Sequence, residues 1–162
     1  MKHLFVVRHA AYGGDDRISP DGRQQMLVLG DYIKTALGGS SAYLLSSTAP
    51  RALDSAEVLS LQLGLKEFER VPYLWSGADA PKDAWHCTHG CQKVMEIIDE
   101  RKDKANGLVM VVHLELAQGF SDYVIHNPKF GDHQFDPFAV DVKKGQAVHI
   151  DFEQRKWRIA PI

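Results

Sequence analysis

Apolar runs and helically spaced apolar residues alternate over the first two thirds of the chain. Residues 3–8 and 108–112 each contain a continuous apolar run, and the second run is the most apolar of the sequence. Both runs predict buried strands, and residues 43–45 predict a third. Over 20–37 and 50–63, apolar residues recur every three or four positions, which predicts two amphipathic helices. This alternation is typical of a mainly parallel sheet whose strands are joined by crossover helices.

Residues with known capping preferences mark the ends of both predicted helices. Ser19 can cap a helix whose first residue is Pro20, and Gly38 is a stop signal for it. Pro50 starts the second helix, which runs up to Gly64. Each predicted helix therefore has a defined beginning and end.

The rest of the chain is less regular. No periodic pattern extends over 67–81, whereas residues 94–98 indicate a further helix. Three short segments near the end predict strands, namely 139–142, 147–150 and 157–159. Because only a short turn separates the first two, these strands are expected to add antiparallel pairs at the edge of the sheet.

The expected fold is a three-layer α/β/α arrangement with a mostly parallel sheet and antiparallel edge strands. No linker, internal repeat or low-complexity tract interrupts the 162 residues. A chain of this length is large enough to bury one sizeable core. We therefore expect a single domain over residues 1–162.

Composition argues against several classes of function. The apolar and charged fractions, 44% and 25%, are those of an ordinary globular protein, and the net charge is −2. Without a basic tail or long basic run, neither nucleic acid nor an anionic membrane is an expected partner. No apolar stretch approaches membrane-spanning length, and two cysteines are too few for a disulfide framework. We expect a cytoplasmic protein.

Three predicted strands end in residues that suit phosphate chemistry. Arg8 and His9 follow the first strand, His113 follows the strand at 108–112, and the strand at 43–45 leads towards Arg51. Ligands of open α/β sheets bind outside the carboxyl ends of parallel strands, so these side chains are expected to meet there. Arg51 would also lie in the first turn of its helix, where anions are favoured.

These four side chains could together handle a phosphoryl group without a metal ion. One histidine could attack phosphorus in line, while the other cationic groups balance charge on the transferring oxygens. Neither a metal nor an organic cofactor is expected to take part.

At this point the chain resembles a known family. Residues 4–10 (LFVVRHA), 45–56 (LSSTAPRALDSA) and 111–113 (VVH) are similar to motifs of the histidine phosphatase superfamily, also called phosphoglycerate mutase-like. Residues 19–23 (SPDGR) resemble the family's segment after the first motif. The small size, the lack of cap insertions and the ending at 157–161 most resemble short bacterial SixA-type protein-phosphohistidine phosphatases.

The resemblance implies a role for each residue of the set. His9 would be the nucleophile and form a phosphohistidine that water hydrolyses, while Arg8, Arg51 and His113 would hold the phosphoryl oxygens. His9 must then present a neutral nitrogen, so its other ring nitrogen should donate to an acceptor such as a backbone carbonyl. The positive charges of the two arginines would disfavour protonation of His113, and bound phosphate would favour it again. The substrate would be a phosphohistidine protein or a small phosphorylated metabolite.

Two features depart from the family pattern. Ala10 stands where the family usually has glycine, and its methyl group is expected to tighten the pocket. The glutamate that many relatives place after the segment equivalent to 72–74 is absent. Asp79 and Glu115 are the candidates for the general acid in its place. A phosphoramidate leaving group needs less help from an acid, which fits a phosphohistidine substrate.

Other interpretations of these residues stay open. Arg8 and Arg51 could be surface arginines in ion pairs, and residues 46–48 could cap the following helix. A small-molecule phosphomonoesterase, or a regulatory protein that binds a phosphorylated ligand with weakened catalysis, would use the same residues.

A second cluster of reactive side chains lies outside this set: His86, Cys87, His89 and Cys91. Imidazole and thiolate groups at this density could bind zinc, although the spacing is not that of a standard zinc finger. The alternative is that the cysteines are small buried residues on one face of a helix. We favour the second interpretation and expect no metal.

Overall fold

The computed structural model describes residues 1–75, 88–125 and 140–160, with side chains described from Cys91 onward in the second range. Six strands form one mixed sheet in the order β3-β2-β4-β1-β5-β6. Their bounds are β1 His3–Arg8, β2 Ala42–Ser46, β3 Glu69–Arg70, β4 Gly107–Val112, β5 Ala147–Asp151 and β6 Lys156–Ile159. The first four run parallel, whereas β5 and β6 are antiparallel to their neighbours. The predicted antiparallel edge is therefore confirmed.

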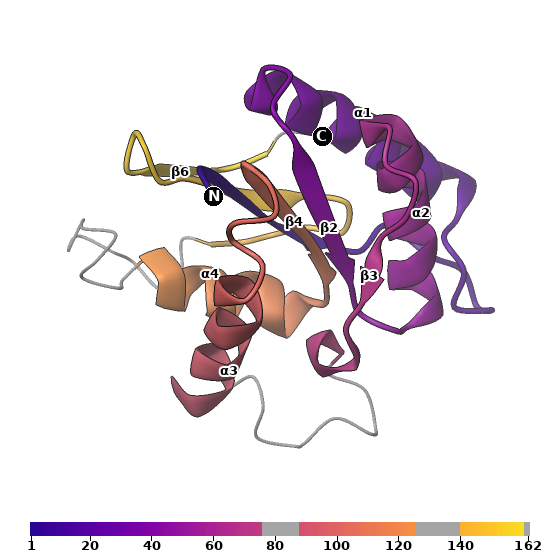
Figure 1. Cartoon of the computed structure of the whole chain (residues 1–162). Helices are drawn as coiled ribbons and strands as arrows, with labels where there is room; N and C mark the ends of the chain where they lie inside the picture. Colours follow the sequence, from indigo (N-terminus) through magenta and orange to yellow (C-terminus); the bar gives the residue numbers. More distant parts are fainter. Residues whose placement is uncertain (76–87, 126–139, 161–162) are drawn as a thin grey trace.

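Helices cover both faces of the sheet (Figure 1). Helices α1 (Pro20–Leu37) and α2 (Pro50–Leu63) pack on one face around Phe5, Val7 and Val109. Helices α3 (Thr88–Asp99) and α4 (Leu114–Ile125) pack on the other face. Because successive strand residues point to opposite faces, two separate apolar clusters form, as a three-layer α/β/α fold requires.

The predicted helix ends are confirmed for α1 and α2. The Ser19 hydroxyl accepts a hydrogen bond from the Gly22 amide at 3.0 Å, and Gly38 ends α1 in the left-handed conformation. Helix α2 starts at Pro50, but its N-cap residue, Ala49, offers no side-chain cap. The hydroxyls of residues 46 and 47 bond elsewhere, so the capping interpretation of these two serines is wrong.

Three elements differ from the prediction. Strand β3 and the 3₁₀ turn η1 (Pro72–Leu74) lie in the segment that shows no periodicity, and α4 was not predicted. Residues 140–142 form no strand, although they alternate between buried and exposed positions. The Val142 carbonyl instead accepts a hydrogen bond from the Arg8 guanidinium, so a side chain takes the place of a strand partner.

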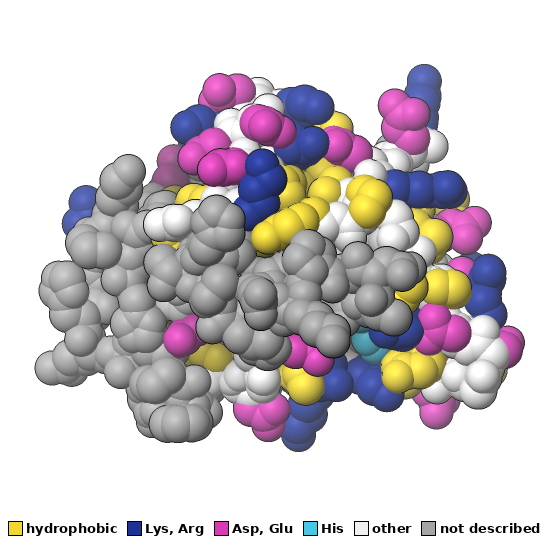
Figure 2. All heavy atoms as spheres, turned by 90° about the horizontal axis from the view of Figure 1, so that it is seen from below, with side chains coloured by type: hydrophobic (Ala, Val, Ile, Leu, Met, Phe, Trp, Pro, Cys, Tyr) yellow, Lys and Arg dark blue, Asp and Glu magenta, His cyan; other side chains and the backbone are white. Residues whose placement is uncertain are grey.

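The strand register brings the candidate residues to one edge of the sheet. Arg8 on β1 pairs with Val112 on β4, and Ser46 on β2 pairs with Val111. The next residues along the chain are His9 after β1, Ser47 after β2 and His113 after β4, so all three lie side by side at this edge. Figure 2 looks onto this edge and shows a small patch of histidine with lysine or arginine and apolar side chains on part of its border.

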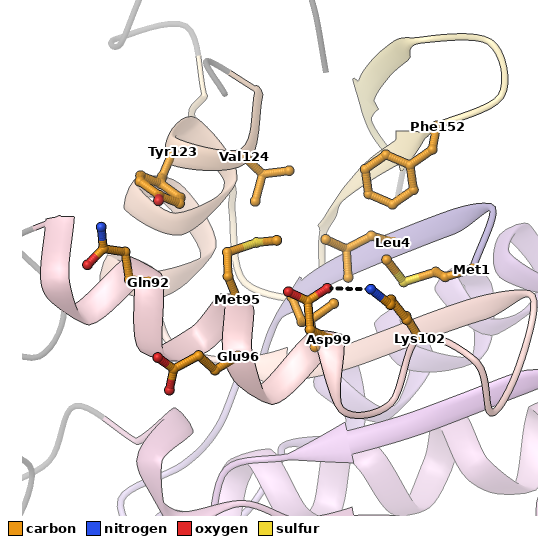
Figure 3. Close-up of a pocket in the computed structure, with 11 residues that line it drawn as sticks. Met1, Leu4, Gln92, Met95, Glu96, Asp99, Lys102, Tyr123, Val124 and Phe152 are labelled. Atoms are coloured by element: carbon orange, nitrogen blue, oxygen red, sulfur yellow. Dashed lines mark hydrogen bonds and ion pairs between the residues drawn. The ribbon is translucent and has the colours of Figure 1, made fainter. Parts of the chain in front are cut away.

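A separate pocket of about 640 Å³ opens between α3, α4 and the start of β1 (Figure 3). Met95, Tyr123 and Phe152 line it together with other apolar side chains, and an ion pair between Lys102 and Asp99 lies at its rim. None of the four predicted phosphate-site residues lines this pocket.

Among the described residues, no helix combines the length and the apolar character needed to cross a membrane.

Candidate active site

His9 lies directly after β1 and is almost fully buried. Its backbone amide donates to the Val112 carbonyl at 3.0 Å, which ties the residue to the neighbouring strand. Its ring Nδ1 lies 2.9 Å from the Ala10 carbonyl oxygen. Since a carbonyl only accepts hydrogen bonds, Nδ1 carries the proton and Nε2 presents a lone pair. That lone pair faces Arg51, whose Nε donates to it at 3.2 Å.

His113 lies between β4 and α4, with its ring centroid 5.1 Å from that of His9. Its Nδ1 lies 3.2 Å from Nη2 of Arg51, and its Nε2 lies 2.8 Å from the Ser47 hydroxyl. Because a guanidinium can only donate, Nδ1 of this neutral ring accepts and Nε2 donates to Ser47. The two histidines therefore present opposite tautomers to the same guanidinium.

Arg51 joins the site from the first turn of α2. Besides both histidines, its guanidinium contacts the carboxylate of Asp16 and lies 5.1 Å from the centre of the Tyr12 ring. Its own carbonyl accepts from the Ser55 hydroxyl at 2.7 Å. Ser55 in turn accepts from the Ala10 amide at 3.0 Å, so one serine ties α2 to the backbone next to His9.

Arg8 brings a second guanidinium to the same edge. Its Nη1 donates to the Val142 carbonyl at 2.9 Å. Its Nε is buried and has no hydrogen-bond partner among the residues that the structure describes. Leaving a buried charged donor unpaired is costly, and an oxyanion in the pocket would remove that cost. Burial lowers the pKa of Arg8, while the charges of Glu115 and Asp141 oppose this shift.

Both histidines are held neutral by their surroundings. Burial lowers the pKa of His9 to about 4, and the charges of Arg51, Arg8 and Lys144 act in the same direction. Burial lowers the pKa of His113 to about 3, with further lowering by His9 and the two arginines. A neutral His9 is a competent nucleophile, whereas His113 needs an anion beside it to become charged.

The structure places the methyl group of Ala10 away from the solvent side of the site. Ala10 has no exposed surface and belongs to the apolar cluster under α1 and α2, together with Val7, Ala49 and Ala52. The expectation that this methyl group tightens the pocket is therefore wrong. Its backbone takes part in the site instead, through the carbonyl that orients His9.

Of the two candidates for the general acid, Glu115 lies within the described residues and Asp79 does not. Glu115 is exposed in the first turn of α4, close enough for its charge to act on Arg8.

Sequence reasoning missed three side chains at the mouth of the site. Asp16 pairs with Arg51 and has a positive φ of 61°, in the segment between β1 and α1. Tyr12 presents its ring to His9, with 5.3 Å between ring centroids, and Lys144 lies 4.2 Å above the centre of that ring. No periodic pattern predicts these positions, because they depend on how two connecting segments fold.

The proposed metal ligands are mostly beyond the described side chains. His86 and Cys87 lie outside the described residues, as does the side chain of His89. Cys91 is buried in the apolar cluster around α3 and α4, which agrees with the interpretation as a small core residue. Among the described residues, no group of three or more histidine, cysteine or acidic side chains could hold a metal ion.

The chain resembles solved phosphatase and mutase structures over nearly its full length. Against a mycobacterial glucosyl-3-phosphoglycerate phosphatase in complex with vanadate (VO3), the TM-score is 0.64 at 16% identity, covering 100% of this chain and 99% of the other. The protein histidine phosphatase SixA with tungstate gives 0.63 at 14% identity, covering 98% and 94%. A phosphoglycerate mutase from Plasmodium falciparum gives 0.60 at 16% identity, covering 99% and 89%.

No protein-family model matches the chain, and no curated protein matches it by sequence. The structural similarity confirms the predicted phosphoglycerate mutase-like fold.

Proposed function

We propose that this chain is a metal-independent phosphatase of the histidine phosphatase superfamily, acting through a phosphohistidine intermediate on His9. The observation that carries the proposal is the position of Arg51, which lies 3.2 Å from both His9 Nε2 and His113 Nδ1. A phosphoryl group in front of this guanidinium would meet the nucleophile and the positive groups at once. Two proteins of similar fold were solved with the phosphate-like anions vanadate and tungstate.

The first chemical step is attack by His9 Nε2 on phosphorus. A bond forms between Nε2 and phosphorus while the bond to the leaving group breaks, and that bonding pair departs with the leaving group. For this, Arg51 must exchange its contact with Nε2 for contacts with the phosphoryl oxygens. The hydrogen bond from Nδ1 to the Ala10 carbonyl stabilises the positive charge that develops on the ring.

Charge on the transferring oxygens is balanced by fixed cations. Arg51 and Arg8 supply two guanidinium groups, and the unpartnered Arg8 Nε is one donor ready for an oxygen. The dianion also raises the proton affinity of His113, which can then donate from Nδ1 to a phosphoryl oxygen. Positioning and electrostatics of this kind account for most of the catalysis in phosphoryl transfer.

The second step returns the enzyme to its starting state. Water attacks phosphorus of phospho-His9, the P–N bond breaks, and inorganic phosphate leaves. Glu115 is our first candidate for carrying protons to the leaving group and from this water, with Asp79 as the alternative. Neither is needed to hold the phosphoryl group.

Protein phosphohistidine is the substrate class that we favour, with small phosphorylated metabolites as the alternative. Its P–N bond releases an imidazole, which is a good leaving group and depends little on a strong acid. A cytoplasmic location stays a prediction from composition.

The test is hydrolysis of a phosphohistidine peptide and of p-nitrophenyl phosphate by the purified chain, with and without a chelator. We expect chelator-independent turnover that falls at least about 10³-fold in His9→Asn, because the nucleophile is lost. The control is Lys143→Met, which changes an exposed residue outside the predicted phosphate site and should keep wild-type turnover. Full activity of His9→Asn would contradict the nucleophile assignment. An inert wild type that still binds vanadate would favour the regulatory binding protein.

A further inference from the structure

Lys144 lies at the mouth of the site on a turn that is hydrogen-bonded to the backbone of Arg8 and His9. The Gly145 amide donates to both the Arg8 and His9 carbonyls at 3.1 Å, and the Arg8 amide donates to the Gln146 carbonyl at 2.9 Å. A hydrogen bond from the Gln146 amide to the Lys143 carbonyl closes the turn at 3.0 Å. The turn that carries Lys144 therefore cannot move independently of His9.

The Lys144 ammonium rests on an aromatic surface rather than on a carboxylate. It lies 4.2 Å from the centre of the Tyr12 ring, within cation–π distance. Tyr12 meets His9 edge-on, so the ammonium is one ring away from the nucleophile. Among the described residues, no acidic side chain forms an ion pair with Lys144.

The other cations at this edge already have acidic neighbours. Arg51 pairs with Asp16, and the charges of Glu115 and Asp141 act on Arg8. Among the described residues, no carboxylate lies at ion-pair distance from Lys144, and none does from Arg8, although the charges of Glu115 and Asp141 act on Arg8. Lys144 contacts the Tyr12 ring, which in turn contacts His9, so it is placed for a group next to the transferring phosphoryl group.

We propose that Lys144 and Tyr12 form a second anion subsite, so that preferred substrates carry a carboxylate or another anionic group beside the phosphoryl group. This inference rests on the proposed phosphatase function, which it extends to the substrate class. The exposed Tyr12 ring supplies an apolar surface for the atoms that link the two anions. An acidic residue beside phosphohistidine and the carboxylate of a small phosphorylated acid would present the same chemistry.

The experiment compares substrates that differ only in the second charge. One pair is a phosphohistidine peptide with glutamate or glutamine next to the phosphohistidine, and the other is phosphoglycolate and its amide. For wild type we expect kcat/KM to favour the charged member of at least one pair by about three- to tenfold, as for a partly exposed ion pair. A preference confined to one pair identifies the source of the anion.

Variants then assign the preference to Lys144. In Lys144→Met the ratio should fall to about one, and in Lys144→Glu it should invert, because the second anion is then repelled. Lys143→Met, on the same turn, should keep the wild-type ratio. Equal kcat/KM for both members of both pairs in wild type, or an unchanged ratio in Lys144→Met, would overturn the subsite.

A binding measurement separates this subsite from the proposed activity. Dissociation constants of the same ligands report the charge preference even when turnover is absent. Loss of turnover with a retained preference would overturn the phosphatase and leave the subsite standing. Turnover with equal affinity for the charged and neutral ligands would overturn the subsite and leave the phosphatase standing.

Discussion

At the scale of single residues, the site is organised around ring tautomers. The carbonyl of Ala10 fixes the proton of His9 on Nδ1, and the guanidinium of Arg51 fixes that of His113 on Nε2. Both assignments follow from the fact that a carbonyl cannot donate and a guanidinium cannot accept. Burial and nearby positive charge then keep both rings neutral.

This arrangement predicts the titration of the two rings. With pKa values lowered to about 4 and about 3, His9 and His113 should stay neutral as the pH falls through 6.5, where an ordinary histidine protonates. Long-range ¹H–¹⁵N NMR spectra should show the Nδ1–H form for His9 and the Nε2–H form for His113 at pH 6. His9→Asn and His113→Asn assign the signals.

Phosphate provides the second half of that titration test. Because a bound dianion favours the charged imidazole, saturating phosphate should raise the pKa of His113. Titration of either ring near 6.5 in the ligand-free protein, or a His113 pKa that phosphate leaves unchanged, would contradict the electrostatic description of the site.

At the scale of elements, the turn at 143–145 connects the edge strands to the backbone of Arg8 and His9. Gly145 has a φ of +80°, and a Cβ there would lie 2.7 Å from Cβ of Gln25 on α1. Glycine is needed at this position both for the backbone conformation and for the close approach of α1.

Replacing this glycine should therefore affect stability and activity together. We expect Gly145→Ala to lower the free energy of unfolding by roughly 2 kcal/mol or more, because strain and crowding add. It should also lower kcat/KM, since the turn bonds to the carbonyls of Arg8 and His9. Urea denaturation and steady-state kinetics measure the two effects.

Gly39 offers a matched control for this change. Its φ is +86°, but a Cβ at this position would have no neighbour within 4 Å. Gly39→Ala should therefore show only the strain, roughly 1–2 kcal/mol, with kcat/KM retained. Equal stability losses in the two variants, with activity kept in both, would show that the turn does not support the site.

At the scale of the whole molecule, strand ends that are distant in sequence converge at one edge. The order β2-β4-β1 sets the residues after three parallel strands side by side, and α2 adds Arg51. Apolar periodicity and chain order were enough to predict this, because the carboxyl ends of parallel strands share an edge. His9, Arg51 and His113 were therefore predictable from the sequence.

What sequence reasoning missed depends on non-periodic contacts. Asp16, Tyr12 and Lys144 lie on connecting segments, whose shapes come from individual hydrogen bonds rather than from burial patterns. Residues 140–142 show the opposite error. Their alternating pattern predicted a strand, but no strand forms there, and the Val142 carbonyl accepts a hydrogen bond from Arg8 instead. Helix α4 did carry a usable signal, since its buried positions include Leu116, Phe120 and Val124 at helical spacing.

The measurement that tests the central claim most directly is detection of the phosphoryl group on the enzyme during turnover. The wild-type chain is mixed with a phosphohistidine peptide, quenched at alkaline pH within the first turnover, digested and analysed by mass spectrometry. We predict an acid-labile phosphoryl group on His9, absent from His9→Asn. Rapid turnover with no phosphoryl group on His9, or with the group on His113 instead, would contradict the account.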